Sequence, residues 1–202
     1  MTYKPTTAEW MGASFVAALA IVLMIYLGAG HGEKLGLALR ATARWSFLWF
    51  WLASVGSALA TLFGSSFRAL ARRGRDFGLA FASAHLVHLG LVAWLLCHSV
   101  TPFPRSPLIL FGVGVFWVYL LALLSIRRVA AMLAPSVWRV LFTLGVEYIS
   151  FAFLVDFAKN PFQGGIMNLL AYLPFLALAV AGPLLRLAAV AKRVSQTQRL
   201  AV

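Results

Sequence analysis

Apolar residues follow one another along this chain in long runs, which short polar segments rich in charges, proline or glycine separate. Six such runs cover about residues 10–30, 42–63, 76–100, 106–126, 135–157 and 165–189. Each run is long enough for one helical membrane span, which needs about 20 residues. The pattern predicts an all-α polytopic membrane protein, in which residues 1–202 form a single six-helix transmembrane bundle.

The first run is not expected to be a cleavable signal peptide, because it is too long and five similar runs follow it. Prolines break the chain between the third and fourth runs, at Pro102, Pro104 and Pro107. Asn160-Pro161 and Gly164-Gly165 do the same between the fifth and sixth.

The composition supports the membrane assignment and narrows the chemistry. Hydrophobic residues make up 62% of the 202 residues and charged residues 11%, whereas soluble domains are roughly half apolar and about a quarter charged. No GxGxxG, P-loop or GxSxG motif occurs, so flavin or nicotinamide chemistry would have to come from a partner. The single cysteine, Cys97, cannot form an intrachain disulfide and offers no zinc-binding spacing.

The charge is strongly basic: 17 Lys and Arg against 5 Asp and Glu give a net charge of +12. Basic residues concentrate on the cytoplasmic side of membrane proteins. Twelve of the 17 fall on the side predicted to hold both termini, so both termini are expected in the cytoplasm, and the charge indicates topology and anionic lipid rather than nucleic acid. The twelve are Lys4, Arg68, Arg72, Arg73, Arg75, Arg127, Arg128, Arg139, Arg186, Lys192, Arg193 and Arg199, and the other side holds Lys34, Arg40, Arg44, Arg105 and Lys159.

Three of the four histidines lie in the third run: His85, His88 and, near its end, His98. His85 and His88 are three residues apart and therefore share a helix face. Neutral imidazole is the commonest metal ligand and also an axial ligand of haem, so the pair predicts a metal or haem site. The alternative is that each histidine only hydrogen-bonds to a neighbouring helix. His31 lies in a connection and is expected to be solvated.

Glu147 lies in the middle of the fifth run. Ionisable groups at that depth are costly and are therefore functional candidates. We expect it either to pair with His85 or His88, or to serve a proton or quinone site. The alternative is a neutral glutamic acid bonded to a serine or carbonyl group on the next helix. Arg139 and Asp156, near the ends of that run, are expected to contact lipid headgroups.

Aromatic residues are plentiful. Trp10, Trp45, Trp49 and Trp138 lie near predicted span ends, as in an aromatic belt. The second run also carries a stripe that is consistent either with a flat cofactor or with ordinary packing and lipid contact. Its members are Trp45, Phe47, Trp49, Phe50 and Trp51.

Two segments carry a family resemblance. Residues 40–45 (RATARW) and 72–88 (RRGRDFGLAFASAHLVH) resemble the ferric reductase-like transmembrane family, most closely its branch of haem-binding membrane subunits of bacterial periplasmic methionine sulfoxide reductase systems. That branch has six spans and no soluble domain. The resemblance implies that Arg75 and the Gly78–Phe81 run precede a haem ligand at His88, with His85 one turn before it.

The chain departs from the family in the fifth run. The family carries further haem histidines there, after a Trp-Arg motif and again about one span depth later. Trp138-Arg139 is present, but the ligand positions fall near Phe142 and near Val155 or Asp156, and the run contains no histidine. Three interpretations remain: haem with a weak or absent second ligand, a scaffold that has lost the site, or a pocket for quinone, pigment or lipid.

The leading functional hypothesis is therefore an electron-transfer subunit without a catalytic domain of its own. It would carry b-type haem in a bacterial inner membrane and pass electrons to a protein partner in a membrane or periplasmic redox complex. His88, His85, His98 and Glu147 are its candidate cofactor-binding residues, and His88 and His85 its candidate iron ligands. The rival is a non-catalytic accessory subunit of a larger complex; a small-solute transporter is less well supported, because broken helices do not recur in two halves.

Overall fold

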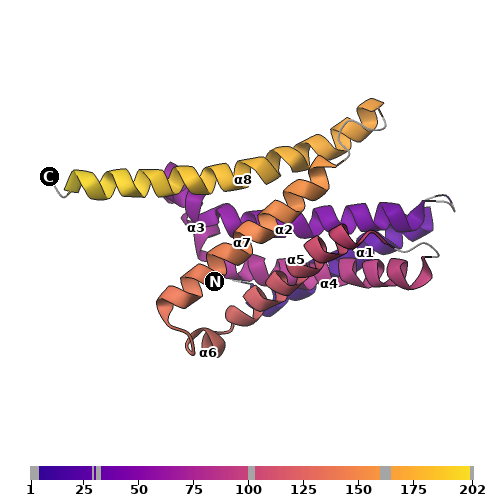
Figure 1. The fold of residues 1–202 in the computed structure, drawn as a ribbon, viewed down its shortest axis with the longest axis horizontal. Coiled ribbons are helices and arrows are strands. Elements are labelled where there is room, and N and C mark those ends of the chain that lie inside the picture. Colours follow the sequence, from indigo (N-terminus) through magenta and orange to yellow (C-terminus); the bar gives the residue numbers. More distant parts are fainter. Residues whose placement is uncertain (1–4, 29, 31–32, 100–102, 160–164, 201–202) are drawn as a thin grey trace. The chain divides into compact units, whose positions relative to one another are not determined.

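The computed structural model of the protein describes residues 5–28, 30, 33–99, 103–159 and 165–200. In this part of the chain the secondary structure is helical throughout, without a strand, which confirms the predicted all-α class (Figure 1). The elements are α1 (Thr7–Gly28), α2 (Lys34–Phe63), the 3-10 turn η1 (Ser65–Phe67), α3 (Arg68–Arg72), α4 (Gly74–His98), α5 (Arg105–Leu124), α6 (Arg127–Ala130), α7 (Pro135–Ala158) and α8 (Gly165–Leu200).

Six of these helices are long and apolar enough to cross a membrane, judged by length and composition: α1, α2, α4, α5, α7 and α8. A helix satisfies its own backbone hydrogen bonds, which a chain surrounded by lipid cannot otherwise do. The chain is therefore an integral membrane protein, consistent with the expected six-helix bundle.

The helices start and end close to the predicted runs, with two exceptions. α2 begins at Lys34, about two turns before the predicted residue 42, and α8 continues to Leu200 rather than ending near residue 189. Arg40 and Lys192 lie just outside an apolar run but inside a helix, because arginine and lysine are good helix formers. Both helices therefore extend past their most apolar segments.

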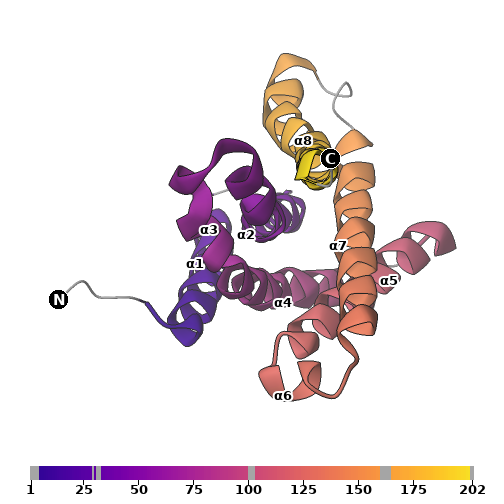
Figure 2. The same cartoon turned by 90° about the vertical axis from the view of Figure 1, so that its left-hand side faces the viewer.

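The chain divides into two compact units. The first contains α1, the part of α2 up to Phe50, α4 and the beginning of α5. The second contains the rest of α2, then α3, the rest of α5, α6, α7 and α8. Figure 2 looks along the helices of the first unit and shows α1, α2 and α4 next to one another.

Small residues bring α1 and α4 of the first unit together. Ser14 Oγ donates to the carbonyl of Ala80 at 2.9 Å, and Ser83 Oγ donates to the carbonyl of Met11 at 3.0 Å. Ala18 and Ala84 are fully buried one turn further along. Small side chains of this kind allow membrane helices to approach closely.

The predicted aromatic stripe is used in packing. Trp10, Trp49 and Phe77 meet with ring centroids 5.4–5.7 Å apart, and Trp45 lies edge-on against Trp49. Trp45 Nε1 also donates to the carbonyl of Ser14 at 3.1 Å. The remaining members behave in the same way: Phe47 and Phe50 are buried and Trp51 Nε1 donates to the carbonyl of Leu178.

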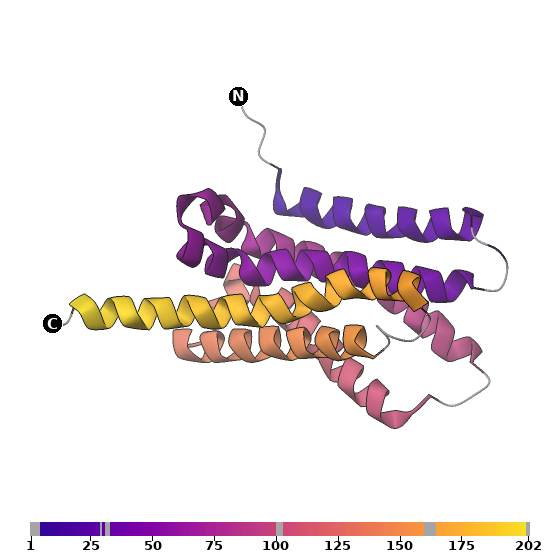
Figure 3. The ribbon, with the colours of Figure 1, turned by 90° about the horizontal axis from the view of Figure 1, so that it is seen from above.

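In the second unit, α7 and α8 lie side by side (Figure 3). The α7 backbone also approaches α5 closely at Gly145, where an added Cβ would lie 2.8 Å from Trp117 Cε3. Near its C-terminal end α8 is tied to the end of α2: Lys192 Nζ donates to the carbonyl of Leu62 at 3.1 Å and Arg193 Nη2 to Thr61 Oγ1 at 2.7 Å.

Candidate functional site

His85 and His88 lie together on α4, as their spacing predicts. Their rings stack with centroids 5.2 Å apart and planes inclined by 26°. Phe81, one turn before His85, packs against its ring at 5.4 Å. Both histidines are partly buried, so the pair is a partly buried polar group on a mainly apolar helix.

Thr42 of α2 fixes the orientation of His88. Thr42 Oγ1 lies 3.1 Å from His88 Nδ1 and 2.8 Å from the carbonyl of Ala38, one turn earlier on its own helix. The hydroxyl of Thr42 donates to the carbonyl of Ala38, and it accepts from His88 when the ring carries its proton on Nδ1. The carbonyl of Leu39, 3.2 Å from Thr42 Oγ1, is a further acceptor for the ring.

In that tautomer the proton lies on Nδ1 and the lone pair on Nε2. Metal-bound histidines commonly donate their other ring N–H to a nearby oxygen in this way, which fixes both the tautomer and the ring orientation. His88 therefore has the arrangement that a single-nitrogen metal ligand requires.

His85 differs from His88 in having no such anchor. Its Nδ1 is buried, and among the described residues it has no hydrogen-bond partner. A buried polar atom without a partner costs free energy. His85 is therefore the group of this pair that gains most from a ligand or a bound water.

His98, the third candidate, belongs elsewhere. It lies ten residues beyond His88, about 15 Å along the helix. There it is exposed, stacks on Trp94 with a centroid separation of 4.0 Å, and its Nδ1 is 2.9 Å from the carbonyl of Trp94. His98 therefore does not belong to the pair formed by His85 and His88. His31 lies outside the described residues.

Glu147, expected to pair with His85 or His88, pairs with an arginine instead. Arg186 of α8 donates from Nε to Oε1 at 2.9 Å and from Nη2 to Oε2 at 2.8 Å. The same Nη2 donates to Ser150 Oγ at 2.9 Å. Of the alternatives expected for Glu147, the pair with a histidine is therefore not the one seen, because Arg186, inside the predicted sixth run, bonds both carboxylate oxygens.

The arrangement offers one protein ligand on one side of a cofactor. His85 lies one turn before His88 on the same face of the same helix, so it cannot bind the opposite side of a haem that His88 binds. In α7 the family positions hold Phe142, which stacks on Trp138, and Val155 and Asp156. Within the described ranges, no three His, Cys, Asp or Glu side chains gather as a metal cluster.

Sequence reasoning missed Thr42 and Ser150. Both are small polar residues in apolar helices, and both return a hydrogen bond to their own helix, Thr42 to Ala38 and Ser150 to Val146. A hydroxyl facing a titratable side chain on a neighbouring helix is a signal only when the helix pairing is known.

Comparisons with known protein families, with curated proteins and with solved structures find no significant match.

Proposed function

We propose that the chain is a redox subunit of a bacterial inner membrane, with both termini in the cytoplasm, in which His88 supplies the single protein ligand of a b-type haem. The observation that carries the proposal is the contact of 3.1 Å between Thr42 Oγ1 and His88 Nδ1, which supports the tautomer in which Nε2 of His88 is available to bind iron. The neighbouring His85, whose Nδ1 has no partner among the described residues, supports a ligand site at the same place.

In this proposal the haem supplies one-electron transfer, and the chain supplies its binding. Thr42 holds the imidazole of His88 in one tautomer, and Phe81 and His85 provide flat surfaces next to it. Electrons would pass to a protein partner, since the chain has no nucleotide-binding motif of its own.

The test is an optical spectrum of the protein purified after haem-replete expression. We expect a Soret band and a reduced α-band, lost in His88→Ala and retained in His98→Ala and His31→Ala. The His98 variant is the matched control, because it removes an exposed imidazole from the same helix. A protein without a Soret band would exclude the haem assignment.

A second candidate is a non-catalytic accessory subunit of a larger membrane complex. It is favoured by the absence of histidine from the fifth run and by the engagement of Glu147 with Arg186, which leaves both carboxylate oxygens in an ion pair. Native purification distinguishes the two candidates. A chain that purifies alone with a bound redox cofactor excludes the accessory function, and a chain that purifies in a complex without cofactor supports it.

A further inference from the structure

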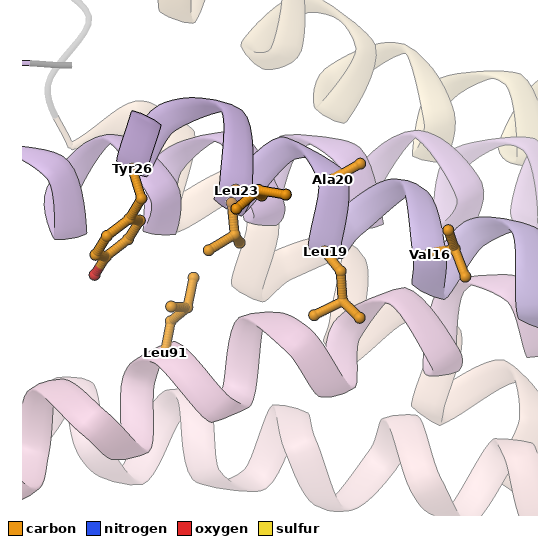
Figure 4. A pocket seen from close by; sticks show the side chains of 7 residues that line it. Val16, Leu19, Ala20, Leu23, Tyr26 and Leu91 are labelled. Carbon is orange, nitrogen blue, oxygen red and sulfur yellow. The ribbon is translucent and has the colours of Figure 1, made fainter. Parts of the chain in front are cut away.

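A groove opens between α1 and α4 in the part of the first unit nearest the connection from α1 to α2. It has a volume of about 660 Å³. Figure 4 shows its side chains, with Leu19 and Leu23 of α1 directed towards α4 and Leu91 of α4 directed back towards α1. The lining residues are Val16, Leu19, Ala20, Val22, Leu23, Tyr26 and Leu91.

The sequence explains why the two helices separate here. Towards the beginning of α1 they meet through Ser14 and Ala18, which face Ala80 and Ala84. Beyond Ala18 the groove is lined by the larger side chains of Leu19, Leu23 and Leu91. Close packing at one end and large side chains at the other leave a groove that runs along the helices.

The groove is apolar and faces outward. Val16 and Leu23 are 63% and 59% exposed, and every lining side chain except the Tyr26 hydroxyl is hydrocarbon. At the depth of a membrane span the surrounding solvent is lipid. The lining of the groove therefore suits a hydrocarbon chain.

A cation lies next to Tyr26, the lining residue nearest the end of α1. Lys34, the first residue of α2, donates from Nζ to the carbonyl of Tyr26 at 2.8 Å. An ammonium has three donors, so two remain for another acceptor. Lys34 is therefore bonded to Tyr26, the last residue of α1 that lines the groove. Its positive charge lies near the end of α1, which is two residues further on at Gly28.

We propose that this groove is a binding site for one anionic phospholipid, whose acyl chain lies between α1 and α4 and whose phosphate accepts from the Lys34 ammonium. The chemistry that recognises the lipid is apolar contact over Leu19, Leu23 and Leu91 together with charge complementarity at Lys34. The site lies at the membrane face on which α1 ends. It does not rest on haem binding at His88.

The experiment is a lipid titration of the full-length detergent-purified protein followed by native mass spectrometry. The probes are palmitoyl-oleoyl phosphatidylglycerol and phosphatidylcholine with the same acyl chains. We expect one saturable site that binds the anionic lipid about five-fold more tightly, the ratio given by one lysine near a headgroup. Equal affinities for the two lipids would overturn the charge recognition.

Two variants separate the headgroup from the chain. Lys34→Gln should bring the two lipids to the same affinity, whereas Arg105→Gln, which removes an exposed cation from the start of α5, should not. Leu91→Trp should fill the groove and weaken both lipids at least ten-fold, whereas Met24→Trp, on an exposed α1 position outside the groove, should leave them unchanged.

Other outcomes identify other occupants. If Leu91→Trp converts a dimer into a monomer and leaves the bound lipid in place, the groove binds a second copy of the chain and the proposal fails. If Lys34→Gln changes nothing while Leu91→Trp removes both lipids, the groove takes any acyl chain and the anionic site is excluded. Unfolding temperatures of all four variants, measured in the same detergent, show whether each retains the fold.

Discussion

Arg186 of α8 holds Glu147 of α7 through two parallel hydrogen bonds of 2.9 and 2.8 Å. This two-pronged geometry is the strong form of an arginine–carboxylate pair. The arginine side chain is 16% exposed and that of the glutamate 49%, so the pair is shielded mainly on the arginine side. Two opposite charges thereby enter apolar helices as one neutral group.

Glu147→Gln should destabilise the protein by roughly 2 kcal/mol. Removing one partner of a fully buried pair costs about 3–5 kcal/mol because it leaves the other charge uncompensated, and the half-exposed glutamate reduces that figure. The measurement is the free energy of unfolding in mixed micelles. In a double-mutant cycle, Arg186→Gln should cost little more once Glu147→Gln is present.

The control for this cycle is Arg139→Gln. Arg139 is an exposed cation on the same helix, and its Nε donates to the carbonyl of Pro135. It should give no coupling with Glu147→Gln. Additive effects of the Glu147 and Arg186 substitutions would show that the ion pair contributes nothing measurable.

Thr42→Val should weaken haem retention at least ten-fold under the proposed function, because second-shell partners of metal-bound histidines contribute about 10–100-fold in affinity. Thr42→Ser should retain the cofactor, since it keeps the hydroxyl that accepts from Nδ1–H of His88. NMR of protein labelled at its histidine ring nitrogens reports the tautomer directly. An unchanged His88 tautomer in the valine variant would exclude the positioning role of Thr42.

Gly145→Ala should destabilise the second unit by about 1–3 kcal/mol, the usual cost of overpacking. Its added methyl group would lie 2.8 Å from Trp117 Cε3 and 3.0 Å from Leu121 Cγ. Gly90→Ala is the matched control, because nothing lies within 4 Å of a Cβ there and alanine favours the helix by roughly 0.5–1 kcal/mol. Thermal unfolding that ranks the two variants in the opposite order would contradict the close α5–α7 approach.

Ala84→Leu should force α1 away from α4, because Ala84 is fully buried in a cluster with Ala18 and Val87. We expect a loss of about 1–3 kcal/mol, measured by chemical unfolding in micelles. Ala93→Leu, at an exposed position of the same helix, should cost almost nothing. Equal stabilities would show that the small-residue contact does not hold these helices together.

The single cysteine provides a test of topology. Cys97 is exposed and lies one residue before the end of α4, on the side predicted to face away from the cytoplasm. A membrane-impermeant maleimide added to intact cells should therefore label it. In the reporter variant Cys97→Ser with Ser136→Cys at the start of α7, labelling should require broken cells, and the reverse pattern would invert the predicted orientation.

The helices could be predicted from the sequence because every membrane span needs a run of about 20 apolar residues. Such runs are visible in the sequence, and α1, α4, α5 and α7 begin and end within a few residues of them. The start of α2 and the C-terminal end of α8 were not predictable in this way. Where a helix leaves the membrane, water solvates its charged residues. The helix can then continue beyond the end of its apolar run.

The site was less predictable than the helices. The shared face of His85 and His88 follows from a spacing along one helix, and the structure confirms it. The partners of His88 and Glu147 depend on which helices meet and at what height, and a single sequence does not encode that directly. The sequence shows Thr42 and Arg186, but it does not show that Thr42 contacts His88 or that Arg186 bonds Glu147.

The length of α8 has a consequence for the lipid around it. At 36 residues the helix is about 54 Å long, against about 30 Å of bilayer hydrocarbon. Lys192 reaches the end of α2, and Arg186, six residues earlier, lies about 9 Å deeper. Hydrophobic mismatch is therefore expected to act on the ion pair, with shorter acyl chains bringing Arg186 and Glu147 nearer to water and longer ones burying them further. Membrane thickness would then change how strongly these two charges attract each other.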